Sequence, residues 1–444
     1  MRLRLLFLLT SFAFLASCSS SGSDEPSPNN SSSSHSNGGN NGSSAIIQCT
    51  ALPDELSKDQ DDLGLSNAIV IRYNKGSAPY IYNPYAEVQT EVTGENVVVK
   101  VASTTVTAYN FVVSGTATNG SLKMYGEFRT VLYLNGVSIA NTSGPAINSQ
   151  INNRMTVHLV AGTENFLADG TGYDKGESAT EQAKGTFFSE GALIFEGSGY
   201  LGVRGRNNHA IVSDGRLTVE SGCIAVTESE NDGIHANNDI TINGGIVNIT
   251  SKGDAIQSER LAVIVSGGQV IAKTTGIKSH GIASGDSTAV NSPANGRTTI
   301  KDNARIDITV DGNGSKGIKS SGFTEIMGGT INIQVNGSQH IQTSPRDTSG
   351  AAGIKLDSDL FIEGGNLTIK SLGNTAKGIN VDGSFFMTGG NIDIDADDDG
   401  IKMKGDLRVT GGSGTVRSRK TTALDCATGK TCNKGSLQTQ DGGF

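Results

Sequence analysis

The sequence predicts an all-β protein, folded as a right-handed parallel β-helix in which three short strands make each coil. Three observations support this fold class. A dipeptide Gly-Ile or Ala-Ile recurs along the second half of the chain, with a period of 21 to 25 residues where repeats abut. Apolar residues follow each isoleucine at fixed offsets. Glycine contributes 59 of the 444 residues and tryptophan is absent, which favours many strands and turns over helices.

The fixed offsets define the strands of one repeat. After Ile234, offsets 6 and 8 hold Ile240 and Ile242, and offsets 13 and 15 hold Val247 and Ile249. Alternate side chains of a strand face the same side, so each pair marks one buried strand face. A unit of ~22 residues cannot bury this face alone, but stacked copies enclose a continuous core. A leucine-rich horseshoe is the main alternative, and its Leu and Asn consensus is absent.

The repeats are expected to begin at isoleucines that share this context. Most are followed ten residues later by a glycine pair, which supplies the turn between the second and third strands. An insertion is expected at residues 279–295 and another at 337–352, each forming a loop outside the coil. The expected starting isoleucines are Ile211, Ile234, Ile256, Ile277, Ile318, Ile354, Ile379 and Ile401.

The N-terminus has the pattern of an exported lipoprotein. Arg2 and Arg4 precede an apolar run of about a dozen residues, which is shorter than the ~20 that span a bilayer. The run ends in Leu-Ala-Ser-Cys, which resembles a bacterial lipobox, so residues 1–17 are a predicted signal peptide and Cys18 the predicted lipidation site. An ordinary secretory signal is the alternative. We expect an outer-membrane lipoprotein in the cell envelope, attached to the membrane only through its lipid.

The rest of the chain divides into four predicted parts. Residues 18–44 are almost wholly Ser, Asn and Gly and form a flexible tether, whose Asp24 and Glu25 hint at surface exposure. Residues 45–85 form a small N-terminal cap, with 52–63 as the best helix candidate. The β-helix spans 86–425, and 426–444 form a C-terminal tail. Cys426 and Cys432 are close enough in sequence for a disulfide, whereas Cys49 and Cys223 have no obvious partner.

Several motifs resemble those of a known family. They are NDGIHANNDITINGGIVNIT at residues 231–250, KGIK at 316–319, DGIK at 399–402, NGVSI at 135–139 and GPAI at 144–147. Together they resemble the bacterial carbohydrate-binding β-helix domains of secreted proteins and lipoproteins, over about residues 90–425. The resemblance implies a pectate-lyase-like fold, bound calcium, and binding of polygalacturonate or cellulose.

A stacked repeat turns one sequence offset into a column of side chains on the surface. The position after each isoleucine carries His235, Lys278, Lys319, Lys355 and Lys402, which predicts a basic stripe on a protein of net charge −9. The carboxylates of an acidic polysaccharide could neutralise that stripe, so these five are the predicted ligand-binding residues. The alternative is that the lysines extend into solvent or pair with neighbouring Asp and Glu. The net acidity argues against nucleic acid as a partner.

A second column carries carboxylates. Asp232 and Asp254 lie two positions before consecutive isoleucines, and Asp397, Asp398 and Asp399 form the densest acidic cluster of the chain. Calcium takes six to eight oxygen ligands, so these five are the predicted calcium ligands. The alternative is that they are ordinary turn residues.

The sequence favours polysaccharide binding without catalysis, by a monomer. A calcium-dependent lyase is one alternative, although Arg204, Arg206, Arg216, Arg260 and Arg305 lie in no recognisable motif for a catalytic base. An adhesion protein with a stiff stalk is the other. The histidines outside the tether, at positions 158, 209, 235, 280 and 340, show no metal-binding spacing.

Overall fold

The computed structural model describes residues 63–102, 108–173, 181–285 and 295–442. The predicted signal peptide, Cys18, the tether and Cys49 lie outside the described residues, as does nearly all of the helix candidate at 52–63. No helix in the described part of the chain is long and apolar enough to cross a membrane.

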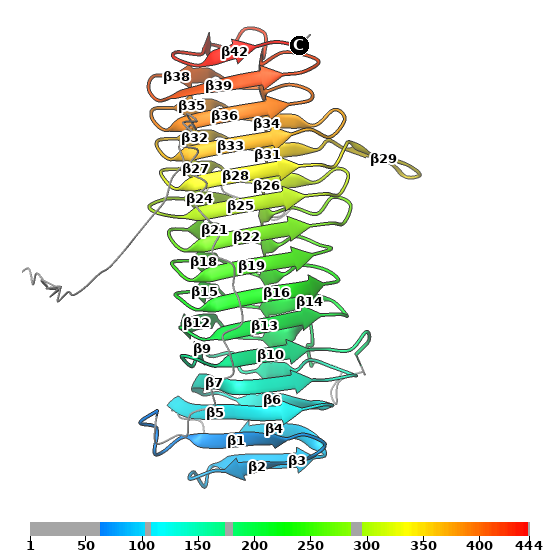
Figure 1. Cartoon of the computed structure of the whole chain (residues 1–444), viewed down its shortest axis with the longest axis vertical. Coiled ribbons are helices and arrows are strands. Elements are labelled where there is room, and N and C mark those ends of the chain that lie inside the picture. Colours follow the sequence, from blue (N-terminus) through cyan, green and yellow to red (C-terminus); the bar gives the residue numbers. More distant parts are fainter. Residues whose placement is uncertain (1–62, 103–107, 174–180, 286–294, 443–444) are drawn as a thin grey trace, which may run out of the picture. The chain divides into compact units, whose positions relative to one another are not determined.

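The described chain winds into stacked coils of three strands each. One coil contains β17 (Ile234–Ala236), β18 (Ile240–Ile242) and β19 (Ile246–Ser251), and the next contains β20 (Ile256–Ser258), β21 (Ala262–Val265) and β22 (Gln269–Thr274). Each strand pairs in parallel with its counterpart in the next coil (Figure 1). The predicted all-β parallel β-helix is therefore confirmed.

One strand of every coil belongs to a 14-stranded sheet, which carries the candidate site. The first pair, β3 and β4, is antiparallel, and the later neighbours are parallel. In order, its remaining strands are β3 (Val88–Thr93), β4 (Glu95–Val101), β6 (Gly120–Gly126), β8 (Ile147–Gln150), β11 (Gly185–Ser189), β14 (His209–Ser213), β23 (Ile282–Ser284), β26 (Lys316–Ser320), β31 (Ala352–Leu356), β34 (Lys377–Val381), β37 (Ile401–Met403) and β40 (Leu424–Cys426), with β17 and β20 between β14 and β23.

A column of isoleucines on the inner face of this sheet forms one side of the core. Burying each isoleucine stabilises the fold by about 1.5–3 kcal/mol. The predicted inward stack of Ile234, Ile318, Ile379 and Ile401 is confirmed, because all four are 0% exposed. The unbroken run of isoleucines in register is Ile211, Ile234, Ile256, Ile282, Ile318, Ile354, Ile379 and Ile401.

The glycine pairs make turns that other residues would resist. Gly245 has φ of +75°, which L side chains rarely adopt, and a Cβ at Gly244 would lie 2.5 Å from the carbonyl oxygen of Glu220 in the previous coil. The same pair recurs coil after coil, which is why its spacing revealed the repeat.

One predicted repeat start is wrong. Ile277 is 61% exposed, and its neighbour Lys278 has a positive φ of 59°, so both lie in a turn. The core position is taken by Ile282, which pairs with Ile256 on one side and Ile318 on the other. Only two residues lie between the end of β22 at Thr274 and Ile277, too few to turn the corner into the next sheet.

Parallel strands extend past both predicted ends of the β-helix. β1 (Ile69–Asn74) pairs in parallel with β5 (Ala108–Ala117) and antiparallel with β2 (Ser77–Tyr82). At the other end, β41 (Cys432–Asn433) and β42 (Gln438–Gln440) continue the stack over β38 (Leu407–Val409) and β39 (Ser413–Ser418). A disulfide joins Cys426 to Cys432. Cys223 is also disulfide-bonded.

A hairpin leaves the coil between β28 (Thr330–Val335) and β31. Its two strands, β29 (His340–Thr343) and β30 (Arg346–Ser349), pair antiparallel and project from the stack (Figure 1). The hairpin lies within the insertion predicted at 337–352, and its second strand contributes to the groove described next.

Candidate functional site

The outer face of the 14-stranded sheet holds the predicted lysine column, with one change. Lys319 and Lys355 are direct neighbours in register, and Lys402 follows two coils later. Ala283 occupies the place predicted for Lys278, because Ile282 is the core residue of that coil. From β17 onward the column reads His235, Gln257, Ala283, Lys319, Lys355, Asn380, Lys402 and Asp425.

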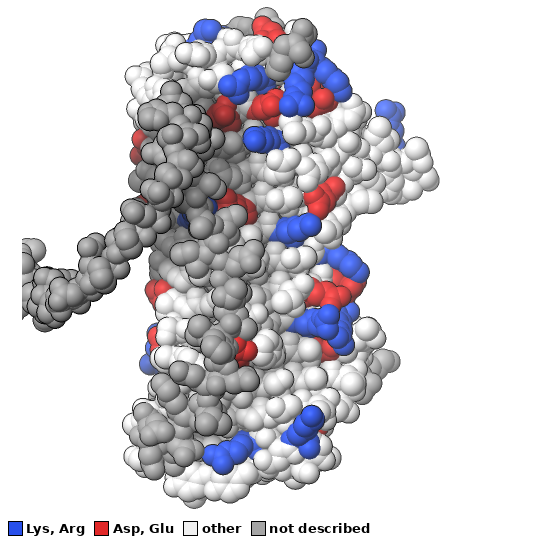
Figure 2. Space-filling view, in the orientation of Figure 1, with Lys and Arg blue, Asp and Glu red and all other residues white. Residues whose placement is uncertain are grey.

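Two of these lysines are neutralised within the protein. Lys355 Nζ lies 2.8 Å from Asp382 Oδ1, and Lys402 pairs with Asp425 in the next coil. Among the described residues Lys319 makes no ion pair, so its charge is available to a ligand. Figure 2 shows one face of the molecule, on which basic and acidic side chains lie next to one another. Of the lysines in this column, Lys319 therefore keeps a charge that a ligand can use, whereas Lys355 and Lys402 are paired with carboxylates of the protein.

The predicted calcium cluster at 397–399 is occupied by amines. Asp397 Oδ2 lies 2.8 Å from Lys420 Nζ, and Asp399 Oδ2 lies 2.7 Å from Lys377 Nζ, which also pairs with Asp398. These contacts hold the pKa of Asp399 below its ordinary value, although burial opposes ionisation. Calcium binding here stays a prediction, and an ion would have to displace these amines.

The second column, two positions before each isoleucine, is a chain of hydrogen bonds along the coils. The backbone N–H of Asp232 donates to His209 Nδ1 at 3.2 Å, and that of Asp254 donates to Asp232 Oδ1 at 2.9 Å. His280 N–H donates to Asp254 Oδ1 at 2.6 Å, and Lys316 N–H donates to His280 Nδ1 at 3.1 Å. Each side chain thus satisfies a backbone donor of the following coil, which would otherwise be left without a partner at the turn.

Burial and neighbouring charges shift the pKa values along this column. Burial, and then the adjacent Asp232 charge, raise the pKa of Asp254 to about 8. Burial also opposes ionisation of Asp232, but the imidazole rings of His209 and His235, each with Nδ1 close to Asp232 Oδ2, outweigh it and hold its pKa well below the ordinary range. Burial lowers the pKa of Lys316 to about 8, with Lys319, Lys355 and Lys278 adding repulsion.

Asp254, His280 and Lys316 of this column line a groove of about 670 Å³, together with His235 and Lys319 of the lysine column. The sheet forms its floor, and β30 of the projecting hairpin contributes Asp347, Thr348 and Ser349. Lys316 Nζ donates to Ser349 Oγ at 2.5 Å and to Gly314 O at 2.7 Å, while Lys278 pairs with Asp347. Three cations therefore border the groove: Lys278, Lys316 and Lys319. Lys278 arrives from a turn rather than from the predicted column.

Reasoning from the sequence missed His209, His280 and Lys316. The sequence did contain a signal for Lys316, because it stands two positions before Ile318, just as Asp254 stands two positions before Ile256. His209 also stands two positions before a predicted core isoleucine, Ile211. His280 could be assigned only after Ile282 replaced Ile277 as the start of its repeat.

A family model described as carbohydrate-binding domain-containing protein matches residues 93–372. The chain belongs to this family. The matched residues of this carbohydrate-binding domain protein include every residue that lines the groove.

A carbohydrate-binding domain-containing protein of Acetivibrio thermocellus is 27% identical over 118 residues, which are 26% of this chain and 41% of the relative. The aligned part thus spans about two fifths of that relative. A solved structure of a polysaccharide lyase-like protein from C. thermocellum, a gadolinium derivative, is 17% identical with a TM-score of 0.38, covering 84% of this carbohydrate-binding domain protein and 99% of the other chain.

Proposed function

We propose that this protein binds an acidic polysaccharide in the groove over β20, β23 and β26, without cleaving it, as a lipoprotein of the cell envelope. Membership of the carbohydrate-binding family supports a glycan ligand. The observation that indicates an acidic glycan is the set of three lysines around one groove: Lys278 pairs with Asp347, whereas Lys316 and Lys319 have no ion-pair partner among the described residues.

The electrostatics of the groove favour an anionic ligand. Three ammonium groups close together repel one another, and this repulsion contributes to the lowered pKa of Lys316. A ligand that brings carboxylates relieves the repulsion, whereas a neutral sugar does not. Successive coils are about 4.8 Å apart, so a uronate chain lying across them meets cations from several coils.

Affinity electrophoresis in gels containing polygalacturonate tests this proposal. Lys319→Gln should weaken retardation by about 1 kcal/mol, or roughly fivefold in affinity, because it removes an unpaired cation from the groove. Lys370→Gln is the matched control, since Lys370 is an exposed lysine on β33 (Asn366–Ser371), in the other sheet. Added salt should weaken binding, because exposed ion pairs are screened over about 10 Å at 0.1 M.

Equal retardation of the two variants would contradict the groove as the binding site. Salt-insensitive binding of neutral cellulose, with no retardation by polygalacturonate, would contradict the acidic ligand. Retardation by neither glycan would favour the adhesion alternative.

One observation supports a lyase as the second candidate. A pKa of about 8 leaves part of Lys316 as neutral amine near neutral pH, and a catalytic base works best when its pKa is close to the working pH. In β-elimination this amine would take the C5 proton α to a uronate carboxylate; the C5–H electron pair forms the C4=C5 double bond, the C4–O bond breaks, and the leaving glycosidic oxygen takes a proton from water. Incubation with polygalacturonate should then yield an unsaturated, ultraviolet-absorbing product that Lys316→Arg abolishes. Binding without product supports the non-catalytic proposal.

A further inference from the structure

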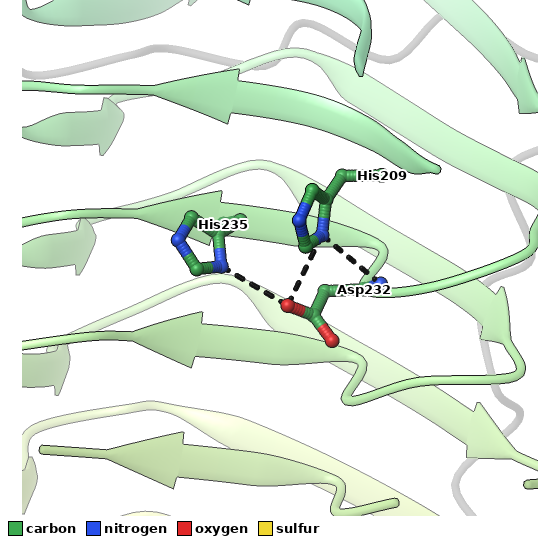
Figure 3. A group of neighbouring side chains, drawn as sticks. All are labelled: His209, Asp232 and His235. Carbon is green, nitrogen blue, oxygen red and sulfur yellow. Dashed lines mark hydrogen bonds and ion pairs between the residues drawn. The ribbon is translucent and has the colours of Figure 1, made fainter. Parts of the chain in front are cut away.

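Three side chains from neighbouring coils converge beside the groove. His209 lies at the start of β14, Asp232 in the turn before β17, and His235 on β17. All three side chains are largely buried, with exposed fractions of 12%, 6% and 13%. Figure 3 shows that both imidazole rings turn a nitrogen toward the carboxylate of Asp232.

The donor atoms have the spacing of ligands around one small cation. Asp232 Oδ2 lies 3.1 Å from His209 Nδ1 and 3.0 Å from His235 Nδ1, and all three atoms lie within 4.8 Å of one another. Bonds from Zn²⁺ to nitrogen and carboxylate oxygen are about 2.0–2.2 Å long, so two ligands at a right angle are roughly 3.0 Å apart and two at a tetrahedral angle roughly 3.4 Å apart. The two separations between Asp232 Oδ2 and the imidazole nitrogens match the first value.

Hydrogen bonding alone does not satisfy His209. Its Nδ1 lies 3.2 Å from the backbone N–H of Asp232 and 3.1 Å from Asp232 Oδ2. A protonated Nδ1 would face the backbone N–H, donor against donor. An unprotonated Nδ1 would face the carboxylate oxygen, acceptor against acceptor. A cation between the three side chains removes the contact between acceptors, because the lone pairs of both nitrogens and of the oxygen then point at one positive charge. The backbone N–H of Asp232 then gives up its hydrogen bond to His209 Nδ1.

We propose that His209, Asp232 and His235 bind a divalent transition-metal ion of the class that prefers imidazole, with Zn²⁺ as the probe. Two nitrogen donors and one carboxylate suit such ions, whereas calcium takes six to eight oxygen ligands at about 2.3–2.6 Å. Gln257 Oε1, 3.2 Å from His235 Nδ1, is placed to complete the donor set from the next coil. The site shares His235 and Gln257 with the lining of the groove but requires none of the three groove lysines, so Zn²⁺ binding can be tested without a glycan.

The site was invisible to a search for metal-binding spacing along the chain. His209 and His235 are 26 residues apart, and the coil, rather than a loop or a helix turn, brings them together. Their ring centroids lie 4.6 Å apart. The intervening Asp232 stands one coil after His209 in the second column, so the three donors come from two stacked coils.

Isothermal titration of the metal-free full chain tests this proposal, using protein without a polyhistidine tag. Zn²⁺ should bind with one ion per chain at this site and raise the thermal midpoint, and Ca²⁺ should not compete. His209→Ala and His235→Ala should each weaken Zn²⁺ binding more than tenfold, because even loss of an outer-shell partner weakens metal sites about 10–100-fold. His158→Ala is the matched control, since His158 also pairs with a single carboxylate, Glu196, on the other sheet.

Binding of Co²⁺ in place of Zn²⁺ adds a spectroscopic measurement that reports on the metal ligands and not on folding alone. The bound ion should give visible absorption bands typical of nitrogen and oxygen ligands, and these bands should change in His235→Gln, checked as folded by circular dichroism. No Zn²⁺ binding by the wild-type chain at tens of micromolar would overturn the proposal. So would affinities in His209→Ala and His235→Ala equal to that of His158→Ala.

Discussion

Glycan binding should weaken as the pH rises through the pKa of Lys316. This lysine is 9% exposed, shares the groove with Lys278 and Lys319, and is also repelled by Lys355. Asp254 is the carboxylate that opposes their effect on its pKa, and His280 is its neighbour in the second column. In the free protein its pKa is lowered to about 8, so it is largely charged at pH 7 and largely neutral at pH 9. A bound polyanion favours the charged form and raises that pKa, so binding is accompanied by proton uptake in this window.

The size of the effect follows from the two pKa values. If the ligand restores the ordinary value of 10.5, the shift is about 2.5 units, or roughly 3.4 kcal/mol at 1.36 kcal/mol per unit. Linkage then makes binding about tenfold weaker at pH 9 than at pH 7, and roughly fivefold weaker if only one unit is restored. The sign is fixed because the free protein loses its proton first. Uronate carboxylates stay ionised throughout, so they add no pH dependence of their own.

Titration calorimetry with polygalacturonate at pH 7 and pH 9, in buffers of different ionisation enthalpy, measures both the affinity and the proton uptake. Lys316→Arg is the control, because guanidinium stays charged in proteins; this variant should lose the pH dependence that Lys316 contributes and keep only that of Asp254, whose pKa is raised to about 8. Equal pH dependence of the wild type and Lys316→Arg would refute the assignment to Lys316. Binding with no proton uptake near pH 8 would refute the presence of the polyanion in this groove.

Three further predictions test the other assignments. If the predicted carboxylates hold calcium, a calcium-selective chelator should lower both the thermal midpoint and glycan affinity, and an unchanged value of both would contradict calcium binding. Ile282→Ala should cost about 2–5 kcal/mol in urea denaturation and Ile277→Ala less than about 0.5, whereas equal costs would contradict the observed register. Cys18→Ser should move the protein from the membrane fraction to the soluble fraction, and unchanged fractionation would contradict lipidation.

The fold could be predicted because every coil of a β-helix requires similar residues at the same offsets in the sequence. The isoleucine, the two strand pairs and the glycine pair recur at fixed offsets, and each offset has one structural cause: an inward position, an alternating strand, or a turn with positive φ. The weaker ends escaped prediction for the same reason. β1 and β42 belong to coils whose offsets do not repeat clearly, although their strands pair in register with the neighbouring coils.

The site could be predicted only in part. A sequence offset that recurs in each coil shows which residues stack on one another along the coils, but not which residues meet across a turn. Lys319 and Lys355 lie in register as expected. Their different availability depends on Asp382, which lies in the turn after β34 and shares no offset with the lysines. The two histidines around Asp232 belong to two different columns, so neither column alone indicates the cluster.

The misplaced repeat at Ile277 shows what local motif matching lacks. Gly276-Ile277-Lys278-Ser279 matches Gly317-Ile318-Lys319-Ser320 better than the true start, Gly281-Ile282-Ala283-Ser284, does. The structure instead aligns the turn at 275–282 with those at 311–318 and 372–379, each of eight residues ending in Gly-Ile. The fourth position of all three has positive φ, at Lys278 (59°), Gly314 (72°) and Thr375 (60°). Ile277 is therefore the counterpart of Asn313 and Asn374. The turn needs eight residues to lead the chain from one strand into the next sheet, and this length places Ile282, rather than Ile277, at the core position. It also carries Lys278 to the rim of the groove, where a cation from a turn joins two cations from the sheet.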